Sequence, residues 1–508
     1  MLRTLRPRVA IVSPTLHRLQ STLNVAIVGS GPSGFYTAHD LLKRPNVKVT
    51  IFDKLPTPFG LSRYGVAPDH LEVKNCEDTF TEAASSDRFA FRGNVEVGKD
   101  VTLQELHERF NSVVLAYGCD RGNRLGIEGE DLPGVINAHE FVGWYNGNPD
   151  TETVRPPLED VEKLVIIGNG NVAMDIARLL LMPAEEVEKS DIAEHAIRVL
   201  KKSKVNDIKI VARRGFLESA FATKEIRELL QLEKYGVKFQ GIDHEVIELL
   251  IPIKNKLERV QKRKLETLLD YMKPDEERRG KKKFQIPDKY TKSWKLEYLL
   301  SPTKVTPNPT NPKLVSEITF QQNVLYHEDP ESPAKVEAVP NQFKTFKADL
   351  VVTSLGFKGR AIPGLDKLGI KFDARKGTIA SRDSRVLNEA GVEVPGIYAA
   401  GWIKNSKRGP ILTTFVDSDA VAQSVIADFE NGVTSGDKVG VEGLEIEGAT
   451  DWKDWENLNK FELEFGKLHD KARWKVPEVT KMLEIIRDGS GSKEDKITKF
   501  KEWLESYQ

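Results

Sequence analysis

The chain has 508 residues, of which 39% are hydrophobic and 30% charged, and its 75 basic residues nearly balance its 76 acidic ones. This length predicts two or more packed domains, and the net charge of -1 argues against a nucleic-acid-binding protein that neutralises many phosphates. With Cys76 and Cys119 as its only cysteines, the sequence has no CxxC redox pair, no four-thiolate iron–sulfur site and no disulfide framework, and we predict no metal site. It also lacks a run of about 18 apolar residues, so we expect no transmembrane segment.

The N-terminal stretch has the composition of a targeting signal. No acidic residue precedes Asp40, whereas Arg3, Arg6, Arg8 and Arg18 alternate with leucines, valines and hydroxyl residues. This bias is typical of a mitochondrial transit peptide. We therefore predict a targeting segment over 1–22, and an untidy basic tail is the alternative.

A strand, a glycine turn and a helix follow directly. VAIV leads into GSGPSG, in which Gly29, Gly31 and Gly34 have the spacing G-x-G-x-x-G. The first glycine permits the turn, the second lets a pyrophosphate approach the backbone, and the third lets the helix pack on the strand. The next strand ends in Asp53, 24 positions after Gly29, where an acid can hold ribose hydroxyls. The pattern predicts a dinucleotide site, and a glycine-rich turn without a ligand is the alternative.

SVVLAYG, at 112–118, is an apolar strand that is predicted to return the chain of this first domain toward its cofactor.

The glycine pattern returns in LVIIGNGNVAMDIARLLL, where Gly168, Gly170 and Ala173 form G-x-G-x-x-A. The following strand, IKIVA, ends in Arg213 and Arg214 where the first unit has an acid. Guanidinium groups bind a ribose 2′-phosphate, which a carboxylate would repel. NADPH is therefore the predicted second nucleotide. The arginines follow 45 positions after Gly168, so the charged segment between them must extend the helix or loop, and a chance pair of arginines is the alternative.

Two later stretches complete the predicted fold. DLVVTSLGF, at 349–357, is a strand that would close the second domain. GIYAAGWIKNSKRGPILTTFVDS, at 396–418, has the order strand, glycine turn and helix start, in which backbone amides can meet a flavin ring and its ribityl chain. Together these elements predict an α/β fold with two Rossmann-like dinucleotide-binding domains.

Several stretches resemble the adrenodoxin reductase family, the mitochondrial NADPH–ferredoxin reductases, in what we expect to be a fungal form. They are PFGLSRYGVAPDHLEVKN, GNVEVGKDVT, LPGVINAHEFVGWYNG, GNGNVAMDIAR and ARRGFLESAFATKEIRE. The resemblance implies FAD in the first cradle and NADPH in the second, with hydride passing to the flavin and single electrons leaving for a [2Fe–2S] ferredoxin. It also implies support of iron–sulfur cluster assembly and of haem A or related biosynthesis.

The resemblance extends to domains and site residues. We expect an NADP-binding domain, 136–356, inserted in an FAD-binding domain made of 24–135 and 357–508. Besides the first-cradle glycines, the implied FAD contacts are Ser33, Asp53, Leu61, Val97, Trp402, Gly409, Pro410 and Ile411. The implied NADP contacts are Asn169, Gly170, Asn171, Val172, Arg213, Arg214, Glu225 and Gly409. The late stretch GWIKNSKRGPI matches the family's GWVKRGPTGVI in length and differs from it in several residues.

Two residues are candidates for the catalytic handling of protons, because reduced flavin must release a proton as it is reoxidised. His70, in the APDH turn, has a side chain that titrates near neutrality. Asp175, in the helix after the second cradle, resembles the family's acid near the ring. A turn-capping histidine and a surface aspartate are the alternatives.

A basic block predicts the partner surface. The stretch 254–264 has six basic residues against one acid, and 278–283 adds five more. This local field can steer an acidic ferredoxin, and Lys262, Arg263 and Lys264 match the family's basic stretch best. A solvated helix face is the alternative. Phospholipid contact is another use of the same charge, which leaves open whether a matrix protein associates peripherally with the inner membrane.

The predicted function is an FAD-dependent NADPH–ferredoxin reductase. The enzymatic alternative is a flavin-dependent NADPH monooxygenase, for which the sequence has no dedicated substrate stretch. The non-enzymatic alternative is a sensor that binds FAD and NADP without turnover, and such a protein would lack NADPH-dependent bleaching of its flavin.

Overall fold

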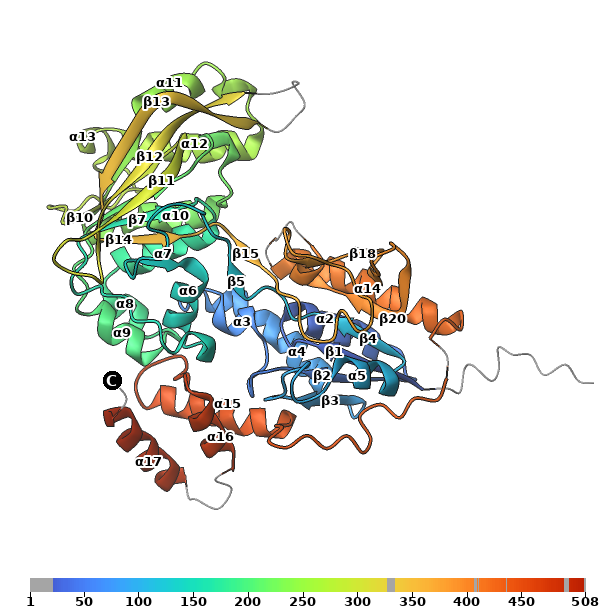
Figure 1. The fold of residues 1–508 in the computed structure, drawn as a ribbon. Coiled ribbons are helices and arrows are strands. Elements are labelled where there is room, and N and C mark those ends of the chain that lie inside the picture. The colour runs from blue at the N-terminus through green and yellow to red at the C-terminus, as the bar shows by residue number, and fades with distance from the viewer. Residues whose placement is uncertain are drawn as a thin grey trace, which may run out of the picture. The chain divides into compact units, whose positions relative to one another are not determined.

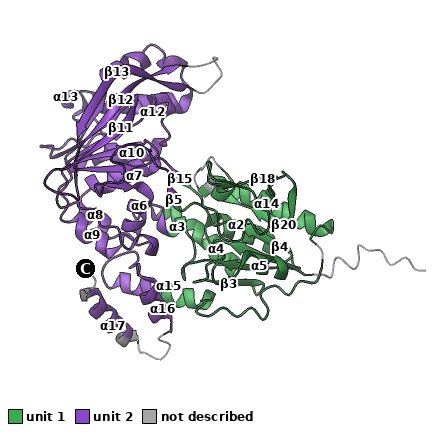
Figure 2. Ribbon diagram, viewed as in Figure 1, with its two compact units in different colours: residues 1–63, 72–120, 358–458 green, residues 64–71, 121–357, 459–508 purple. Residues whose placement is uncertain are grey.

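The computed structural model describes residues 22–326, 334–405, 409, 411–434, 436–487 and 493–506 (Figure 1). The described residues form two compact units, each drawn from three stretches of the chain (Figure 2). Unit 1 takes its residues from 1–63, 72–120 and 358–458, and unit 2 takes its residues from 64–71, 121–357 and 459–508. The predicted targeting segment, apart from Thr22, lies outside the described residues.

Unit 1 is built on a seven-stranded sheet with the order β18-β19-β20-β4-β1-β2-β3. The strands from β20 to β3 run parallel, and β18 and β19 add an antiparallel edge. β4 is buried along its whole length and β1 along most of it, which explains their continuous apolar sequences. The strands are β1 (Leu23–Val28), β2 (Val47–Phe52), β3 (Phe89–Arg92), β4 (Ser112–Leu115), β18 (Ser381–Arg382), β19 (Arg385–Leu387) and β20 (Glu393–Ala399).

Helices follow the strands of unit 1, as the sequence pattern predicts. α2 begins directly after the first glycine turn and packs against α14. The further elements of this unit are α2 (Pro32–Leu42), α4 (Cys76–Ala84), α5 (Leu103–Arg109), β16 (Phe372–Asp373), β17 (Thr378–Ile379), η6 (Gly401–Ile403) and α14 (Ile411–Glu430). Elements at the limits of the units are α3 (Leu61–Tyr64), η1 (Leu71–Asn75), β5 (Arg121–Gly122), β15 (Phe357–Lys358) and α15 (Trp452–Lys467).

Unit 2 contains a six-stranded parallel sheet with the order β6-β14-β7-β8-β10-β9. Its strands are β6 (Val135–Asn137), β7 (Lys163–Ile167), β8 (Asp207–Val211), β9 (Val237–Ile242), β10 (Lys292–Glu297) and β14 (Leu350–Thr353). β14 lies within the stretch predicted to close this domain. The strand–turn–helix construction of both sheets confirms the predicted α/β fold with two Rossmann-like units.

Unit 2 also carries a three-stranded antiparallel sheet made of β11 (Leu300–Pro307), β12 (Val315–Tyr326) and β13 (Lys335–Lys347). Its buried side chains share one apolar core with β7, β8 and β14, including Ile318, Phe320 and Val211. A two-residue turn joins this sheet to β10, so the chain passes from the end of one sheet directly into the other.

The helices of unit 2 bury a larger core against the six-stranded sheet. The helices that do so are α6 (Ala138–Asn146), α7 (Asn171–Leu181), α8 (Ala184–Glu188), α9 (Glu194–Leu200), α10 (Thr223–Gln231), α11 (His244–Leu250) and α12 (Arg259–Met272). The unit also contains α13 (Asp275–Arg278), α16 (Val479–Arg487), α17 (Lys493–Ser506) and the 3-10 turns η2 (Pro149–Thr151), η3 (Phe216–Glu218), η4 (Leu232–Tyr235) and η5 (Lys254–Lys256). Within the described ranges, none of the helices has the length and apolar character that crossing a membrane requires.

The compact units and the predicted domains divide the chain differently. Residues 64–71, 121–135, 357 and 459–508 fall in unit 2, whereas the predicted FAD-binding domain contains them. The last segment is bound to unit 2 through buried lysines: Lys475 Nζ lies 3.2 Å from Asp191 Oδ2, and Lys471 Nζ donates to Ile192 O at 3.0 Å. Contacts of this kind are set by packing and are not visible in local sequence patterns.

Candidate functional site

The glycines of the first turn have two different reasons to be glycine. Gly29 has a φ of 106°, and a Cβ there would lie 2.7 Å from Ala116 O, while a Cβ at Gly34 would lie 2.1 Å from Gly29 O. Gly31 has φ -73° and ψ -177°, which any residue adopts, and its Cβ would meet nothing within 4 Å among the described residues. Packing requires glycine at positions 29 and 34, whereas the open space at Gly31 suits a ligand that comes close to the backbone.

The second turn repeats this division. Gly168 has a φ of 114°, and its Cβ would lie 2.1 Å from Ser354 O. Gly170 has φ -87° and ψ 179°, and its Cβ would again meet no described atom within 4 Å. Gly31 and Gly170 are the N-cap residues of α2 and α7, and neither helix has a side-chain cap from the described residues. The first backbone N–H groups of a helix have no intrahelical partner, and here they include that of the half-buried Val172. Such helix ends fit phosphate groups.

Asp53 lies at the end of β2, next to the first turn. Its Oδ2 accepts hydrogen bonds from Ser30 N at 2.8 Å and Ser30 Oγ at 2.6 Å, and its Oδ1 accepts one from Leu55 N at 3.0 Å. Burial raises the pKa of this carboxyl group in spite of these donors. Asp53 therefore holds the glycine turn in place, and a carboxylate oxygen can accept a further hydrogen bond from a ribose hydroxyl.

Two distant stretches bring predicted FAD residues to the same turn. A Cβ on the glycine before Leu61 would lie 3.0 Å from Gly31 Cα. A Cβ on the glycine before Trp402, which has a φ of 67°, would lie 1.8 Å from Ser33 Oγ. At both positions a side chain would crowd the residues of the first turn, which explains why glycine precedes each of the two predicted contact residues.

The other predicted FAD residues lie in the surrounding segments of unit 1. Val97 is buried in the segment after β3, which also hydrogen-bonds to Asp53 O. Gly409 is half-buried and stands just before α14, which begins at Ile411. Pro410 lies outside the described residues.

Arg213 and Arg214 follow the end of β8, as predicted, although the strand itself ends at Val211. Arg213 is exposed and Arg214 is half-buried, and neither guanidinium group has a hydrogen bond or ion pair with another described residue. α8 and α9 occupy much of the sequence between Gly168 and these arginines, which accounts for the long spacing. Two unpaired cations at a strand end form a suitable anion site.

The loop before α10 contacts the second turn. Asn169 Nδ2 donates to Ser219 Oγ at 3.0 Å, and Asn171 Oδ1 accepts from Ala222 N at 2.8 Å. Glu225 is half-buried on α10, and its Oε2 is buried without a hydrogen-bond partner in the described part of the chain. A buried oxygen of this kind fits a ligand that supplies an N–H or O–H donor.

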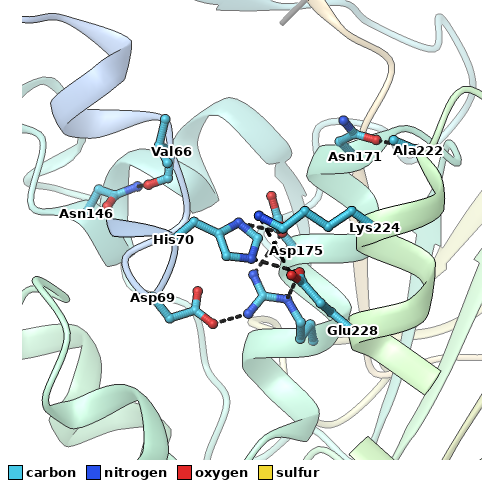
Figure 3. Close-up of polar contacts among 10 residues, drawn as sticks. Val66, Asp69, His70, Asn146, Asn171, Asp175, Ala222, Lys224 and Glu228 are labelled. Atoms are coloured by element: carbon cyan, nitrogen blue, oxygen red, sulfur yellow. Dashed lines mark hydrogen bonds and ion pairs between the residues drawn. The ribbon is translucent and has the colours of Figure 1, made fainter. Parts of the chain in front are cut away.

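His70 lies in a group of charged side chains that come from three segments of unit 2 (Figure 3). Its Nε2 is 2.8 Å from Glu228 Oε2 on α10, and its Nδ1 is 3.9 Å from Asp175 Oδ1 on α7. Arg178, one turn after Asp175, donates from Nη2 to Asp175 Oδ1 at 2.9 Å and pairs through Nη1 with Asp69. The two predicted catalytic residues are thus brought together by packing of α7, α10 and the 64–71 segment.

This group controls the charge of His70. Burial alone lowers the pKa of the imidazole, but its hydrogen bond to Glu228 and the nearby charge of Asp175 outweigh burial and Arg178, so that the pKa is raised. The same hydrogen bond lowers the pKa of Glu228 against the effect of burial, whereas burial raises the pKa of Asp175. The charge of His70 is therefore set by a balance between burial, the carboxylates of Glu228 and Asp175, and the guanidinium group of Arg178.

Glu228, Arg178 and Asp69 were not among the residues predicted from the sequence. Asp69 is the neighbour of His70, and Arg178 stands three residues after Asp175, the spacing of one helical turn. Glu228 is likewise one turn after Glu225, which was predicted for a different role. These spacings were visible, but nothing in the sequence indicated that the two helices and the turn meet.

The basic block does not form one uniform surface. Arg263 is exposed on α12, whereas Lys262 is half-buried and donates to Asn255 Oδ1 at 3.2 Å. Lys264 is half-buried and donates to Phe221 O at 2.6 Å, and burial lowers its pKa. Successive residues of a helix point about 100° apart, so three adjacent cations cannot share one face.

Arg278 is not part of any exposed basic surface, contrary to what its place in RRGKKK suggests. Its side chain is 2% exposed, and Nη1 donates to both oxygens of Glu233, at 2.6 and 2.8 Å. Nη2 donates to Asp275 Oδ1 at 2.7 Å. The described residues contain no group of three or more His, Cys, Asp or Glu side chains that could hold a metal ion.

The chain is similar in sequence to oxidoreductases. A family model described as pyridine nucleotide-disulphide oxidoreductase matches residues 23–242. The probable mitochondrial NADPH:adrenodoxin oxidoreductase of Saccharomyces cerevisiae is 41% identical over 491 residues, which cover 91% of this chain and 96% of the relative. The mitochondrial NADPH:adrenodoxin oxidoreductase of Homo sapiens is 37% identical over 480 residues, which cover 92% of each chain.

A solved structure resembles the whole fold. Mycobacterium tuberculosis FprA in complex with NADPH superimposes with a TM-score of 0.79 at 31% sequence identity, and the match covers 92% of this chain and 99% of FprA. The resemblance therefore extends over both Rossmann-like units.

Proposed function

This chain belongs to the mitochondrial NADPH:adrenodoxin oxidoreductase family, and from that premise we propose that it is an FAD-dependent enzyme that reduces a [2Fe–2S] ferredoxin with NADPH. The observation that carries the proposal is the pair of glycine turns, each of which has one glycine that packing does not require, Gly31 and Gly170. The strand after the second glycine turn is followed by two arginines whose guanidinium groups are unpaired among the described residues, and the strand after the first turn is followed by an acid. The absence of a CxxC pair argues against a protein disulfide as the electron acceptor.

The residues of unit 1 fit FAD. The open space at Gly31 and the free N–H groups of α2 would receive the pyrophosphate, and Asp53 would accept from the ribose. Leu61, Val97, Trp402, Gly409 and Ile411 would line the flavin end. When bound, FAD supplies a group that accepts two electrons together and releases them one at a time, which joins a hydride donor to a one-electron carrier.

The residues of unit 2 fit NADPH. Gly170, Asn171 and Val172 would hold the pyrophosphate at the start of α7, and Arg213 and Arg214 would bind the 2′-phosphate. The unpaired Oε2 of Glu225 would accept from a donor on the nucleotide. His70 would bind and release the proton that accompanies turnover, with Glu228 holding the imidazole and Asp175 adjusting the local charge.

The proposed partner is an acidic mitochondrial ferredoxin that docks on a basic surface formed on α12 by the exposed Arg263 and the half-buried Lys262. Arg263 is exposed there, and Lys262 extends the positive charge. Lys264 would contribute through its field, because its ammonium group is bound to Phe221 O. Electrostatic docking of this kind raises the association rate and weakens as salt is added.

The proposed location is the mitochondrial matrix, because the relatives carry that organelle in their names and the N-terminal composition is that of a transit peptide. Peripheral association with the inner membrane would use the same basic surface. Support of iron–sulfur cluster assembly and of haem A biosynthesis is the proposed cellular role.

The test is NADPH-dependent cytochrome c reduction by the purified yellow protein, with and without a mitochondrial [2Fe–2S] ferredoxin, over a series of salt concentrations. A large stimulation by ferredoxin that declines at high salt supports the proposal. If NADPH bleaches the flavin but ferredoxin does not stimulate the reaction, the assignment of FAD and NADPH stands and the proposal of a ferredoxin partner is refuted.

A further inference from the structure

The backbone that carries Arg213 and Arg214 is held by the three-stranded sheet. Asn323, on β12, donates from Nδ2 to Arg213 O at 3.1 Å. Leu299, in the turn before β11, donates from its backbone N to Arg214 O at 3.2 Å. Both carbonyl groups of the arginine pair are therefore bound by residues that lie about 85 or more positions further along the chain.

Asn323 is itself fixed in place. Its side chain is buried, with 2% of the residue exposed, and its Nδ2 also donates to Ser301 Oγ at 2.9 Å. Its backbone N donates to Leu299 O at 2.7 Å. The pairing of β12 with β13 shifts register between Gln321 and Asn323, so Asn323 stands at an irregularity of the ladder.

The turn that meets the arginines has a specialised backbone. Leu299 has a φ of 59°, a left-handed conformation that a branched side chain rarely adopts. Such a conformation persists where the surrounding contacts enforce it. Here the flanking residue Leu300 donates to Ala212 O at 3.1 Å, so the turn is bound to the chain on both sides of its strained residue.

We propose that Asn323 is a positioning residue for the choice of NADPH over NADH. By holding the carbonyl of Arg213, it keeps the arginine turn in the one backbone conformation from which both guanidinium groups reach a ribose 2′-phosphate. Neither guanidinium has a partner of its own among the described residues, so the hydrogen bonds that order this site are those to the backbone carbonyls of Arg213 and Arg214. A preorganised pair loses less freedom on binding and so binds more tightly. The inference rests on the proposed role of Arg213 and Arg214 in NADPH binding.

The test compares steady-state reduction of ferricyanide by the holoenzyme with NADPH and with NADH, which needs no ferredoxin. Asn323→Ala is expected to raise KM for NADPH about five-fold or more, the effect of one buried hydrogen bond, while kcat and the KM for NADH stay nearly unchanged. Gln321→Ala is the matched control: its amide lies on the same strand, but donates to Val339 O and Gln342 O within the sheet. It is expected to leave the ratio of the two KM values unchanged.

The double variant Arg213→Gln/Arg214→Gln separates this inference from the proposed function. If it raises KM for NADPH alone, and Asn323→Ala adds nothing in that background, the positioning role is supported. If the arginine variant loses selectivity but Asn323→Ala alone does not, or if Asn323→Ala raises both KM values equally, the inference is overturned while the NADPH site stands. If the arginine variant itself keeps full selectivity, the proposed 2′-phosphate site fails. Should Asn323→Ala not fold, Ser301→Ala loosens the same amide and should shift the ratio in the same direction.

Discussion

Alanine at Gly31 is expected to leave the protein folded and to remove its flavin. The backbone angles at Gly31 suit any residue, and an added Cβ meets no described atom within 4 Å. A glycine-to-alanine change at such a position stabilises the folded chain by about 0.4–1 kcal/mol, because it restricts the unfolded chain. The flavin-free protein should therefore unfold at the same temperature as its wild-type counterpart, or a few degrees higher.

The same substitution should strongly lower the affinity for FAD, although it does not lower the stability of the chain. The added methyl group would occupy the space through which a pyrophosphate reaches the first N–H groups of α2. A hydrogen bond to a charged group contributes about 1.5–3 kcal/mol, so loss of two lowers affinity about a hundred-fold or more. The assay is the ratio of FAD to protein after purification and dialysis, followed by urea unfolding of the flavin-free form.

A matched change in the same turn tests the reasoning. Gly34→Ala places a Cβ 2.1 Å from Gly29 O, so this variant should lose stability, with or without flavin. The Gly170→Ala protein should retain its flavin, but NADPH should no longer bleach that flavin. A Gly31→Ala protein that keeps one FAD per chain would refute the assignment of the first turn.

Glu228→Gln should lower the pKa of His70, because that carboxylate does most to offset burial. Because the pKa of His70 is higher in the folded chain than in the unfolded chain, its contribution to stability is complete below the unfolded pKa of about 6.5 and is lost as pH rises through the folded pKa. The variant should therefore lose more unfolding free energy at pH 6 than at pH 9. Equal losses at the two pH values would contradict this reasoning. Arg278→Gln should cost about 3–5 kcal/mol of unfolding free energy, since it removes the cationic partner of the buried Glu233 and leaves Tyr290 Oη donating to it, and it should not change KM for ferredoxin. Arg263→Glu should raise KM for ferredoxin several-fold at low salt, an effect that should shrink toward about 1 M salt; a salt-independent change would argue against a docking role.

The two cradles were predictable because strand, turn and helix are adjacent in sequence, so that glycine spacing alone indicates the geometry. The position of the arginine pair was predictable because the two residues closely follow the end of β8 in the sequence. The charged group around His70 was only half visible, since Glu228 reaches it through the packing of α10 on α7. For Arg278 the sequence was misleading, because a run of basic residues suggests an exposed surface. The side chain is in fact buried in an ion pair with Glu233, which lies 45 positions earlier.

The interleaving of the two units has a consequence for how the molecule is made. In the sheet of unit 1, Val113 on β4 pairs with Ile397 on β20, 284 positions later. Contacts this distant slow folding, and a partly synthesised chain leaves one edge of β4 without its neighbour. Neither unit can be completed before residues beyond 357 are available. The chain is therefore expected to depend on chaperones that shield exposed strands until its last third has emerged, and to acquire its structure in a late, concerted step.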